Sequence, residues 1–416
     1  MSRKNEKYRV TINTPATRII TCGKMVIRET DGNTDGIGFQ YSAEYLDHPF
    51  AFSIDPIALP LSRTTFQLTV NNNTPGFLDD YLPDRWGRKV LTRIATASKK
   101  KNFNSNSIID ILSLVSQSNI GAISIVQQDQ KPYFDLGIHF DELMNAEKAA
   151  QIIDNDTPPE KIQLETAKLI HLWQEGSGGV GGARPKSLVH KDSIGYLAKF
   201  NSNKDDYNNA KVELACLLMA KAAGIDVKGG FVQPDINARD VLLLNRFDLL
   251  NSNKNRLQLI TINAMLKDKN TFVDCGQSFR YDQIQQVLNR YSTNISEDVK
   301  QLLRLMLFNR AINNTDDHER NFSLSNDGTG YRLSPAYDLV PSFAYGQYHA
   351  AGYQYSPTPL KPSEVDGSKR ILGVPKVEAK NCAEQIINAV KQWYHFAELA
   401  GVSEQDADKV SEVLNL

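Results

Sequence analysis

The amino-acid sequence predicts an α+β (α/β mixed) fold in three parts. Residues 8–70 alternate short apolar runs with turn residues, which predicts a small β-rich amino-terminal subdomain. A glycine run at 176–182 precedes strand-like segments, which predicts a second part that contains strands. Several segments after residue 280 have apolar residues at three- and four-residue spacing, which predicts a mostly α-helical third part. We place the three parts at residues 1–145, 146–250 and 251–416.

Composition bounds the class of protein. The chain has 416 residues and 41% hydrophobic content, enough for two or three domains with sizeable cores. Lys and Arg number 47 against 48 Asp and Glu, so the overall charge does not demand a nucleic acid, a membrane surface or an acidic partner. No signal-peptide core is visible, and no apolar run approaches the roughly 20 residues that cross a bilayer. We therefore expect a cytoplasmic protein without membrane contact.

The four cysteines also fit a cytoplasmic protein. Cys22, Cys216, Cys275 and Cys382 lie far apart, without a C-x-x-C pair and without histidines spaced as in a zinc site. We expect them to be reduced, buried thiols.

Turn and helix signals order the amino-terminal part. Asp31-Gly32 and Asp35-Gly36 are typical turn dipeptides between strands and are expected to supply a hairpin turn. Residues 71–94 then carry two apolar patches separated by Pro83, which predicts a pair of amphipathic helices. Trp86 in the second helix is expected to belong to the core.

The glycine run is a candidate phosphate-binding loop. Five glycines stand between Gly176 and Gly182, a density that disfavours helix and strand. Strands are predicted at 186–189 and 194–200, and the second carries Lys199. Backbone amides of such a loop approach phosphate oxygens, and a lysine on the next strand neutralises them. The run matches neither G-x-x-x-x-G-K-[ST] nor G-x-G-x-x-G-x-V, and a flexible linker is the alternative.

A helix predicted at 207–223 carries one more candidate group. Its apolar residues share one face, and Glu213 lies early in the segment. Glu213 is either an exposed helix carboxylate or the residue that orients Lys199, as a helix glutamate orients the strand lysine in kinases.

The most informative stretch runs from Gln301 to Ser342. Its first part has the apolar spacing of a buried helix, and polar residues then crowd together. Asp316 and Asn321 form D-x-x-x-x-N, the interval at which a kinase catalytic loop places its base and a magnesium-holding amide. Asp338 follows a predicted short hairpin. A solvated loop is the alternative, but base, amide and carboxylate together would make a phosphoryl-transfer site. The strands before this stretch and the helices around it then fit a kinase-like β-containing N-lobe and a mostly α-helical C-lobe.

Each polar side chain of this stretch has an expected role. Asp316 orients or deprotonates the acceptor hydroxyl, while Asn321 and Asp338 hold Mg²⁺, which prefers oxygen ligands. Asp317 ranks second as the base because it stands one residue too close to Asn321. His318 is expected to brace the loop or touch the nucleotide, since no second histidine or cysteine supports a metal site.

These strings resemble the HipA family, bacterial serine/threonine kinases that act as toxins of toxin–antitoxin pairs. N-x-x-D-x-H-x-x-N-F-S followed by L-x-P-x-Y-D is similar to the catalytic core of the family, and G-G-A-R-P-K is similar to its ATP-covering loop. Residues 39–46 and 75–88 resemble the subdomain that precedes the kinase in HipA proteins.

The resemblance implies an ATP and Mg²⁺ site. Besides Lys199 and Glu213, the implied cofactor-binding residues are Gly181, Gly182, Ala183, Arg184, Pro185, Lys186, Asn245, Arg246, Phe247, His318, Asn321 and Asp338. Asn245, Arg246 and Phe247 fall where the family holds the adenine, although Arg246 and Asp248 could equally form a structural ion pair. Well-known members carry a self-phosphorylated serine in the loop; the aligned position here is Gly179, which leaves Ser177 as the candidate.

The resemblance also implies partners. These are a small DNA-binding antitoxin like HipB, through which the chain would meet DNA only indirectly, and a protein substrate, in known members an aminoacyl-tRNA synthetase. Two other functions stay open: a kinase of the same fold acting on a lipid or small molecule, and a nucleotide-binding co-repressor partner with little turnover, which the altered glycine loop favours.

Overall fold

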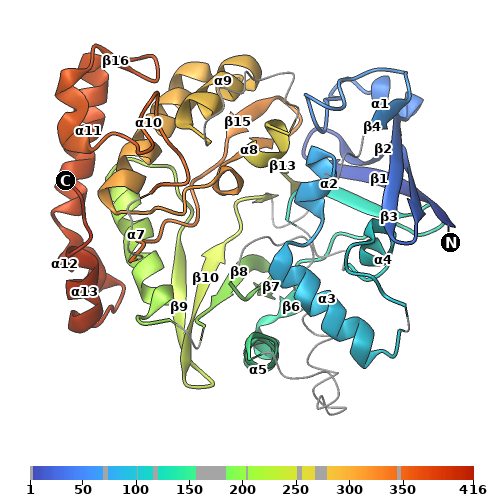
Figure 1. The fold of residues 1–416 in the computed structure, drawn as a ribbon, viewed down its shortest axis with the longest axis horizontal. Coiled ribbons are helices and arrows are strands. Elements are labelled where there is room, and N and C mark those ends of the chain that lie inside the picture. Colours follow the sequence, from blue (N-terminus) through green and yellow to red (C-terminus); the bar gives the residue numbers. More distant parts are fainter. Residues whose placement is uncertain are drawn as a thin grey trace. The chain divides into compact units, whose positions relative to one another are not determined.

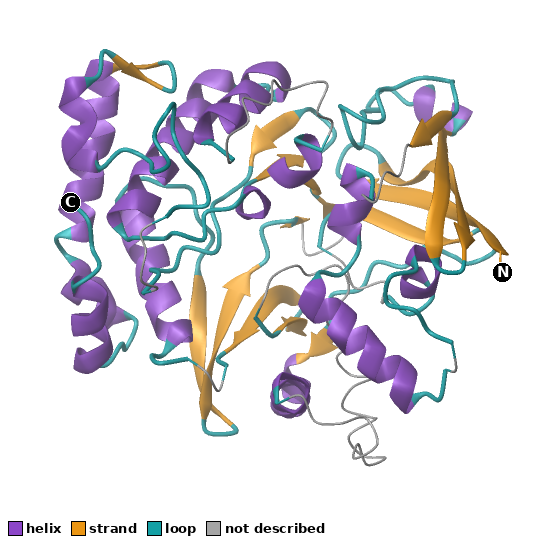
Figure 2. Ribbon diagram, in the orientation of Figure 1, coloured by secondary structure: helices purple, strands orange, loops and turns teal. Residues whose placement is uncertain are grey.

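The computed structural model describes residues 3–68, 74–100, 102–115, 120–155, 184–202, 205–250, 255–267, 279–343 and 348–416. The chain forms two compact units. Unit 1 comprises Met1–Lys204, Gln233–Ile260 and Asn326–Thr329, and unit 2 comprises Asp205–Val232, Thr261–Ser325 and Gly330–Leu416. Figure 1 labels the elements, and Figure 2 shows that helices and sheets are mixed, as the predicted α+β class requires. The predicted boundaries at 145 and 250 stay predictions.

The amino-terminal sheet of unit 1 is antiparallel, with strand order β4-β3-β2-β1-β5. Its strands are β1 (Arg3–Thr14), β2 (Arg18–Thr30), β3 (Asn33–Tyr41), β4 (Phe66–Leu68) and β5 (Ile123–Gln127). Val10 and Ile12 of β1, like Met25 and Ile27 of β2, are fully buried. The two residues of each pair stand two apart in the chain, and this period-two spacing places them on the inner face of the sheet.

The hairpin between β2 and β3 turns at Asp31-Gly32. Both residues have positive φ, 52° and 80°, as a two-residue type I′ turn requires. The prediction of a turn at Asp35-Gly36 is wrong, because both residues lie inside β3. A register shift between Arg28 and Glu29 of β2 accompanies them, so the strand absorbs the irregularity as a bulge and does not reverse there.

Short helices pack with this sheet. They are α1 (Ala43–Leu46), α2 (Gly76–Tyr81), α3 (Arg85–Ala97) and α4 (Ile108–Leu112). The predicted helix pair corresponds to α2 and α3, and α3 begins where the Asp84 carboxylate accepts a hydrogen bond from the Gly87 amide at 2.9 Å. Trp86 is buried among the hydrophobic core residues, as expected.

A second sheet, which lies in unit 1 except for the first residues of β9, carries the candidate lysine. Its strand order is β6-β7-β8-β10-β9, with β6 (Ile138–His139), β7 (Lys186–Lys191), β8 (Ile194–Phe200), β9 (Gly230–Ile236) and β10 (Arg239–Asn245). β7 and β8 pair antiparallel with Lys186 opposite Lys199. Helix α5 (Leu143–Asp154) packs against β7, and β11 (Leu249–Leu250) and β12 (Asn255–Arg256) form a small ladder after β10. β13 (Gln258–Thr261) ends this segment.

Unit 2 is mostly helical. Its helices are α7 (Asn209–Ala222), α8 (Ile262–Met265), α9 (Tyr281–Tyr291), α10 (Ile295–Ala311), α11 (Lys376–Val390), α12 (Trp393–Leu399) and α13 (Glu404–Ser411). Helix α10 packs against α9 and α11, and its residues from Leu305 to Ala311 are all buried. This helix occupies the position that the apolar spacing predicts, and its carboxy-terminal end leads into the polar stretch.

Unit 2 also contains a break between two helices and several short strands. Helices α11 and α12 are separate elements, and the Trp393 indole at the start of α12 is buried and donates to the Ala407 carbonyl at 2.9 Å. The short hairpin strands are β14 (Ser323–Asn326) and β15 (Tyr331–Leu333), and β16 (Arg370–Ile371) pairs with β17 (Val374–Pro375). Of the helices in the described ranges, none has the length and apolarity needed to cross a bilayer.

Candidate active site

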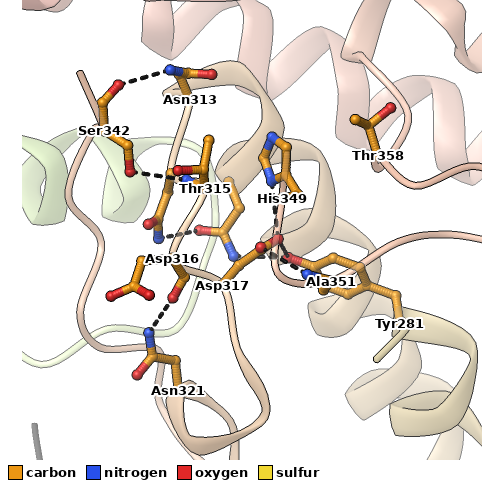
Figure 3. A network of polar contacts seen from close by, with 12 residues as sticks. Tyr281, Asn313, Thr315, Asp316, Asp317, Asn321, Ser342, His349, Ala351 and Thr358 are labelled. Carbon is orange, nitrogen blue, oxygen red and sulfur yellow. Dashed lines mark hydrogen bonds and ion pairs between the residues drawn. The ribbon is translucent and has the colours of Figure 1, made fainter. Parts of the chain in front are cut away.

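The first residues of the polar stretch form a loop that is hydrogen-bonded to Ser342, at the other end of the stretch. Asn313 ends α10 with a positive φ of 54°, a conformation that asparagine tolerates better than most residues. Its side chain donates to the Ser342 carbonyl at 2.8 Å, and the Ser342 amide donates back to the Asn313 carbonyl at 2.9 Å. The Thr315 amide donates to the Ser342 hydroxyl at 3.1 Å. The chain after Asp338 therefore runs alongside the loop (Figure 3).

The two adjacent aspartates of this loop point in opposite directions. The Asp316 side chain is 80% exposed, whereas the Asp317 side chain is 0% exposed. Figure 3 shows Asp317 directed toward His349, Ala351 and Tyr281, and Asp316 directed away from them. Only Asp316 is therefore presented to an incoming molecule.

Hydrogen-bond donors surround the buried Asp317 carboxylate. It accepts from the Tyr281 hydroxyl at 2.8 Å, from His349 Nδ1 at 3.1 Å and from the Ala351 amide at 3.0 Å. Burial, reinforced by the Asp317 charge, raises the pKa of Tyr281 well above its usual range, so the phenol keeps its proton and donates. A buried carboxylate with this many donors needs no metal or solvent to compensate its charge.

The same network continues toward Asp338. Tyr281 accepts a hydrogen bond from Asn309 at 2.9 Å, and Asn309 accepts one from Asn314 at 3.1 Å. The Asn314 side chain also donates to the Asp338 carbonyl at 3.1 Å. A buried hydrogen-bonded chain therefore connects the loop that carries Asp316 to the segment that carries Asp338.

Asn321 and His318 complete the loop. The Asn321 amide nitrogen donates to the Asp316 carbonyl at 2.7 Å, which leaves the amide oxygen as the end that would face a metal. His318 precedes the short 3₁₀ helix Glu319–Asn321 and accepts a hydrogen bond from the Arg320 amide at 3.3 Å. Its Nε2 lies 4.0 Å from an Asp316 oxygen. Whether His318 braces the loop or touches the nucleotide stays a prediction.

Asn321 and Asp338, the two residues predicted to hold Mg²⁺, both carry side-chain oxygen donors. Asp338 has a positive φ of 55°, so its backbone adopts a conformation that most residues avoid. Together, a carboxylate and an amide oxygen are ligands that Mg²⁺ accepts when substrate phosphates and water supply the others. Within the described ranges, no three His, Cys, Asp or Glu side chains gather as a metal site, so a metal held by protein side chains alone is not indicated there.

The candidate phosphate-binding residues lie in unit 1. Lys199 on β8 is buried, at 8% exposure, and Lys186 is its neighbour on β7. Arg184 and Pro185 lie just before β7. The other residues proposed for the glycine loop lie outside the described residues: Ser177, Gly179, Gly181, Gly182 and Ala183.

Glu213 is not an exposed helix carboxylate. It lies on α7 of unit 2 and is 4% exposed, so that alternative is wrong. A carboxylate is rarely buried on a helix without a specific role. Its pairing with Lys199 stays a prediction, because that residue belongs to the other unit.

The segment proposed to meet adenine contains the alternative ion pair. Arg246 donates to both carboxylate oxygens of Asp248, at 3.0 and 2.7 Å, and both side chains are buried. Burial alone would raise the pKa of Asp248, but Arg246 and the Gly121 amide, which donates at 2.8 Å, hold it below its usual range. Asn245 ends β10, and Phe247 follows Arg246 in the turn. Their contact with a nucleotide stays a prediction.

Several residues of the site carry no signal in a single sequence. Tyr281, Asn309 and His349 come from separate segments and meet only in the folded chain. Asn309 stands on the helix face that turns toward the loop, so its polarity within an apolar run was the one visible sign. Tyr281 and His349 resemble ordinary helix and loop residues.

Comparison with known proteins gives independent evidence on the family of this chain. The family model described as the HipA-like C-terminal domain matches residues 178–394, and the model of the HipA N-terminal domain matches residues 22–126. Y4mE of Sinorhizobium fredii (strain NBRC 101917 / NGR234), whose name marks it as a presumed kinase, is 25% identical over 353 residues, which span 78% of this chain and 76% of that protein.

A solved structure shows the same fold. A chain of the Shewanella oneidensis MR-1 toxin–antitoxin complex of HipA, HipB and its operator DNA aligns with a TM-score of 0.68. The alignment covers 98% of this chain and 94% of that chain at 17% identity. At this identity the likeness establishes the fold alone.

Proposed function

Because the chain belongs to the HipA family, we propose that it is an ATP- and Mg²⁺-dependent serine/threonine protein kinase that works in the cytoplasm. The observation that carries the proposal is the pair of adjacent aspartates. One carboxylate is buried and saturated with donors, and the other is exposed on the same ordered loop beside Asn321. An exposed carboxylate on a fixed backbone is what a base for a substrate hydroxyl requires.

The residues divide the work of phosphoryl transfer. Asp316 would accept or orient the proton of the attacking hydroxyl, and the buried state of Asp317 favours this assignment over the reverse. Asn321 and Asp338 would hold Mg²⁺ through oxygen, and Lys199 would neutralise phosphate oxygens, oriented by Glu213. When bound, ATP and its metal supply the phosphoryl group and the charge that stabilises its transfer.

The biological role follows from the family. We propose that the kinase acts as a HipA-like toxin that phosphorylates a protein substrate, in the manner of members that modify an aminoacyl-tRNA synthetase, and so slows translation. The structural relative was solved in complex with HipB and its operator DNA, which supports a HipB-like antitoxin as partner here. Contact with DNA would then be indirect.

The test uses the purified full chain. Incubated with Mg²⁺ and γ-labelled ATP in cell extract, the wild-type protein should transfer label to a protein band, and Asp316→Ala should not. Asp366→Ala is the matched control, since Asp366 is another exposed aspartate of unit 2, at 64% side-chain exposure. Absence of transfer by the wild type would refute the kinase proposal, and equal transfer by Asp316→Ala would refute its assignment of the base.

One observation favours a second candidate. Gly179 stands where well-known family members carry the self-phosphorylated serine, so the usual off-switch is absent at that position. A nucleotide-binding co-repressor that acts with its antitoxin would not need that switch. Tight binding of ATP without transfer in the experiment above would favour this function.

A further inference from the structure

We propose that Asp317 and His349 form a buried positioning pair that fixes the catalytic loop, so that Asp316 and Asp338 keep their relative placement. Neither residue would touch substrate or nucleotide. The inference rests on the proposed kinase function for its effect on rate, but it also predicts a property of the loop that can be measured without any turnover.

The Asp317 carboxylate joins segments that are far apart in the chain. Its donors are the first residue of α9, Tyr281, and two residues of the segment after the catalytic loop, His349 and Ala351. A backbone contact adds to this clamp, because the Ala350 amide donates to the Thr315 carbonyl at 2.9 Å. The loop is therefore held on the side opposite to the one that presents Asp316 (Figure 3).

His349 contributes through one atom. Its side chain is 0% exposed, Nδ1 lies 3.1 Å from the Asp317 carboxylate, and Nε2 is buried without a hydrogen-bond partner. Leaving a buried polar atom unpaired is unfavourable, so an apolar side chain would suit this position better if packing were its purpose. The contact with Asp317 is thus what the imidazole adds.

The Asp317–His349 pair is connected to both Asp316 and Asp338. Asp316 is the residue before Asp317, so the hydrogen bonds that hold the Asp317 side chain also restrict the backbone that carries Asp316. Asp338 is reached through Tyr281, Asn309 and Asn314, the last of which holds the Asp338 carbonyl. Losing the Asp317 contacts would release both ends at once.

Isosteric variants test this pair. Asp317→Asn keeps the shape but converts an acceptor into a donor, so at least one of the surrounding donors loses its acceptor. His349→Phe keeps a buried ring and removes the N–H, whereas His349→Asn keeps an N–H donor at the position of Nδ1 and removes the ring. Asp298→Asn is the control. Asp298 is a buried carboxylate of α10 that binds Arg332, about 20 Å from the loop along the helix.

Two readouts are measured on each variant. The first is label transfer to extract protein at varied ATP, which separates kcat from the KM for ATP. We expect Asp317→Asn and His349→Phe to lower kcat about 100-fold with KM within about twofold, since small misplacements of catalytic groups cost that much. His349→Asn should recover most of the rate. The second is hydrogen exchange of the peptide that covers residues 313–321, which should lose protection in the same two variants and keep it in Asp298→Asn.

Each outcome decides the question. A kcat within threefold of the wild type in Asp317→Asn, a similar loss in Asp298→Asn, or a His349→Asn variant as slow as His349→Phe would overturn the proposal. If the wild type transfers no phosphate, the kinase function fails, and exchange alone decides the pair: unchanged protection of residues 313–321 in Asp317→Asn overturns it, and selective loss supports it.

Discussion

The Asp316 side chain is 80% exposed and the Asp317 side chain is 0% exposed, although the two residues are adjacent. This difference in exposure allows an effect on catalysis to be distinguished from an effect on the fold. We expect a change at the exposed carboxylate to alter the reaction without unfolding the protein, whereas a change at the buried one would disturb the hydrogen bonds of three segments. The predictions below use this separation.

Substitution of Asp316 should abolish transfer without unfolding the protein. We expect Asp316→Asn to lower kcat by about 10²–10⁴-fold, the usual contribution of a positioned base. Because the side chain is exposed, the free energy of unfolding should change by no more than about 0.5 kcal/mol. Transfer rates and urea unfolding curves measure the two effects. A kcat near that of the wild type would assign the base elsewhere.

Substitution of Lys199 should weaken nucleotide binding. Lys199→Met keeps the length and apolar stem of the side chain on β8 but removes the cation expected to neutralise phosphate oxygens. We expect the affinity for a fluorescent ATP analogue with Mg²⁺ to fall at least about tenfold, equal to about 1.4 kcal/mol. Lys191→Met, at an exposed position of β7, is the control and should bind normally. Equal affinities of both variants would remove Lys199 from the site.

The Arg246–Asp248 pair should make unit 1 sensitive to acid. In the folded chain the pKa of Asp248 lies below its usual range, so the charged form is favoured in the folded state. Its contribution to stability is therefore complete above the unfolded pKa of about 4 and is lost as the pH falls through the folded pKa.

Asp248→Asn tests this dependence. It leaves Arg246 buried without its carboxylate, which should lower the free energy of unfolding at pH 7 by about 3–5 kcal/mol. The variant should also lose the part of the acid dependence that Asp248 supplies. Urea unfolding between pH 7 and 3 measures both, and parallel curves for the variant and the wild type would contradict the assignment.

The buried cysteines should be unreactive in the folded protein. Burial raises the pKa of the Cys22 and Cys216 thiols, and neither has exposed surface, so little thiolate is available to a reagent. Iodoacetamide at pH 8 should leave both unlabelled in native protein and label both in urea, as mass spectrometry of the peptides can show. Rapid native labelling of Cys22 would mean that the amino-terminal sheet opens readily.

The sequence predicted what local patterns determine. The period-two face of β1 and β2, the apolar helix α10 and the position of Asp316 after it follow from residues that are neighbours in the chain. It placed a turn wrongly at Asp35-Gly36, because a bulge and a turn use the same dipeptide and only strand pairing distinguishes them. His349 could not be found at all, since its importance arises from a contact 32 residues away in the chain.

At Asp338, stability and the proposed function favour different residues. Its φ of 55° is a conformation that costs an ordinary residue about 1 kcal/mol and glycine nothing. Selection of variants for heat resistance alone would therefore favour glycine at this position, at the expense of the carboxylate that we propose holds Mg²⁺.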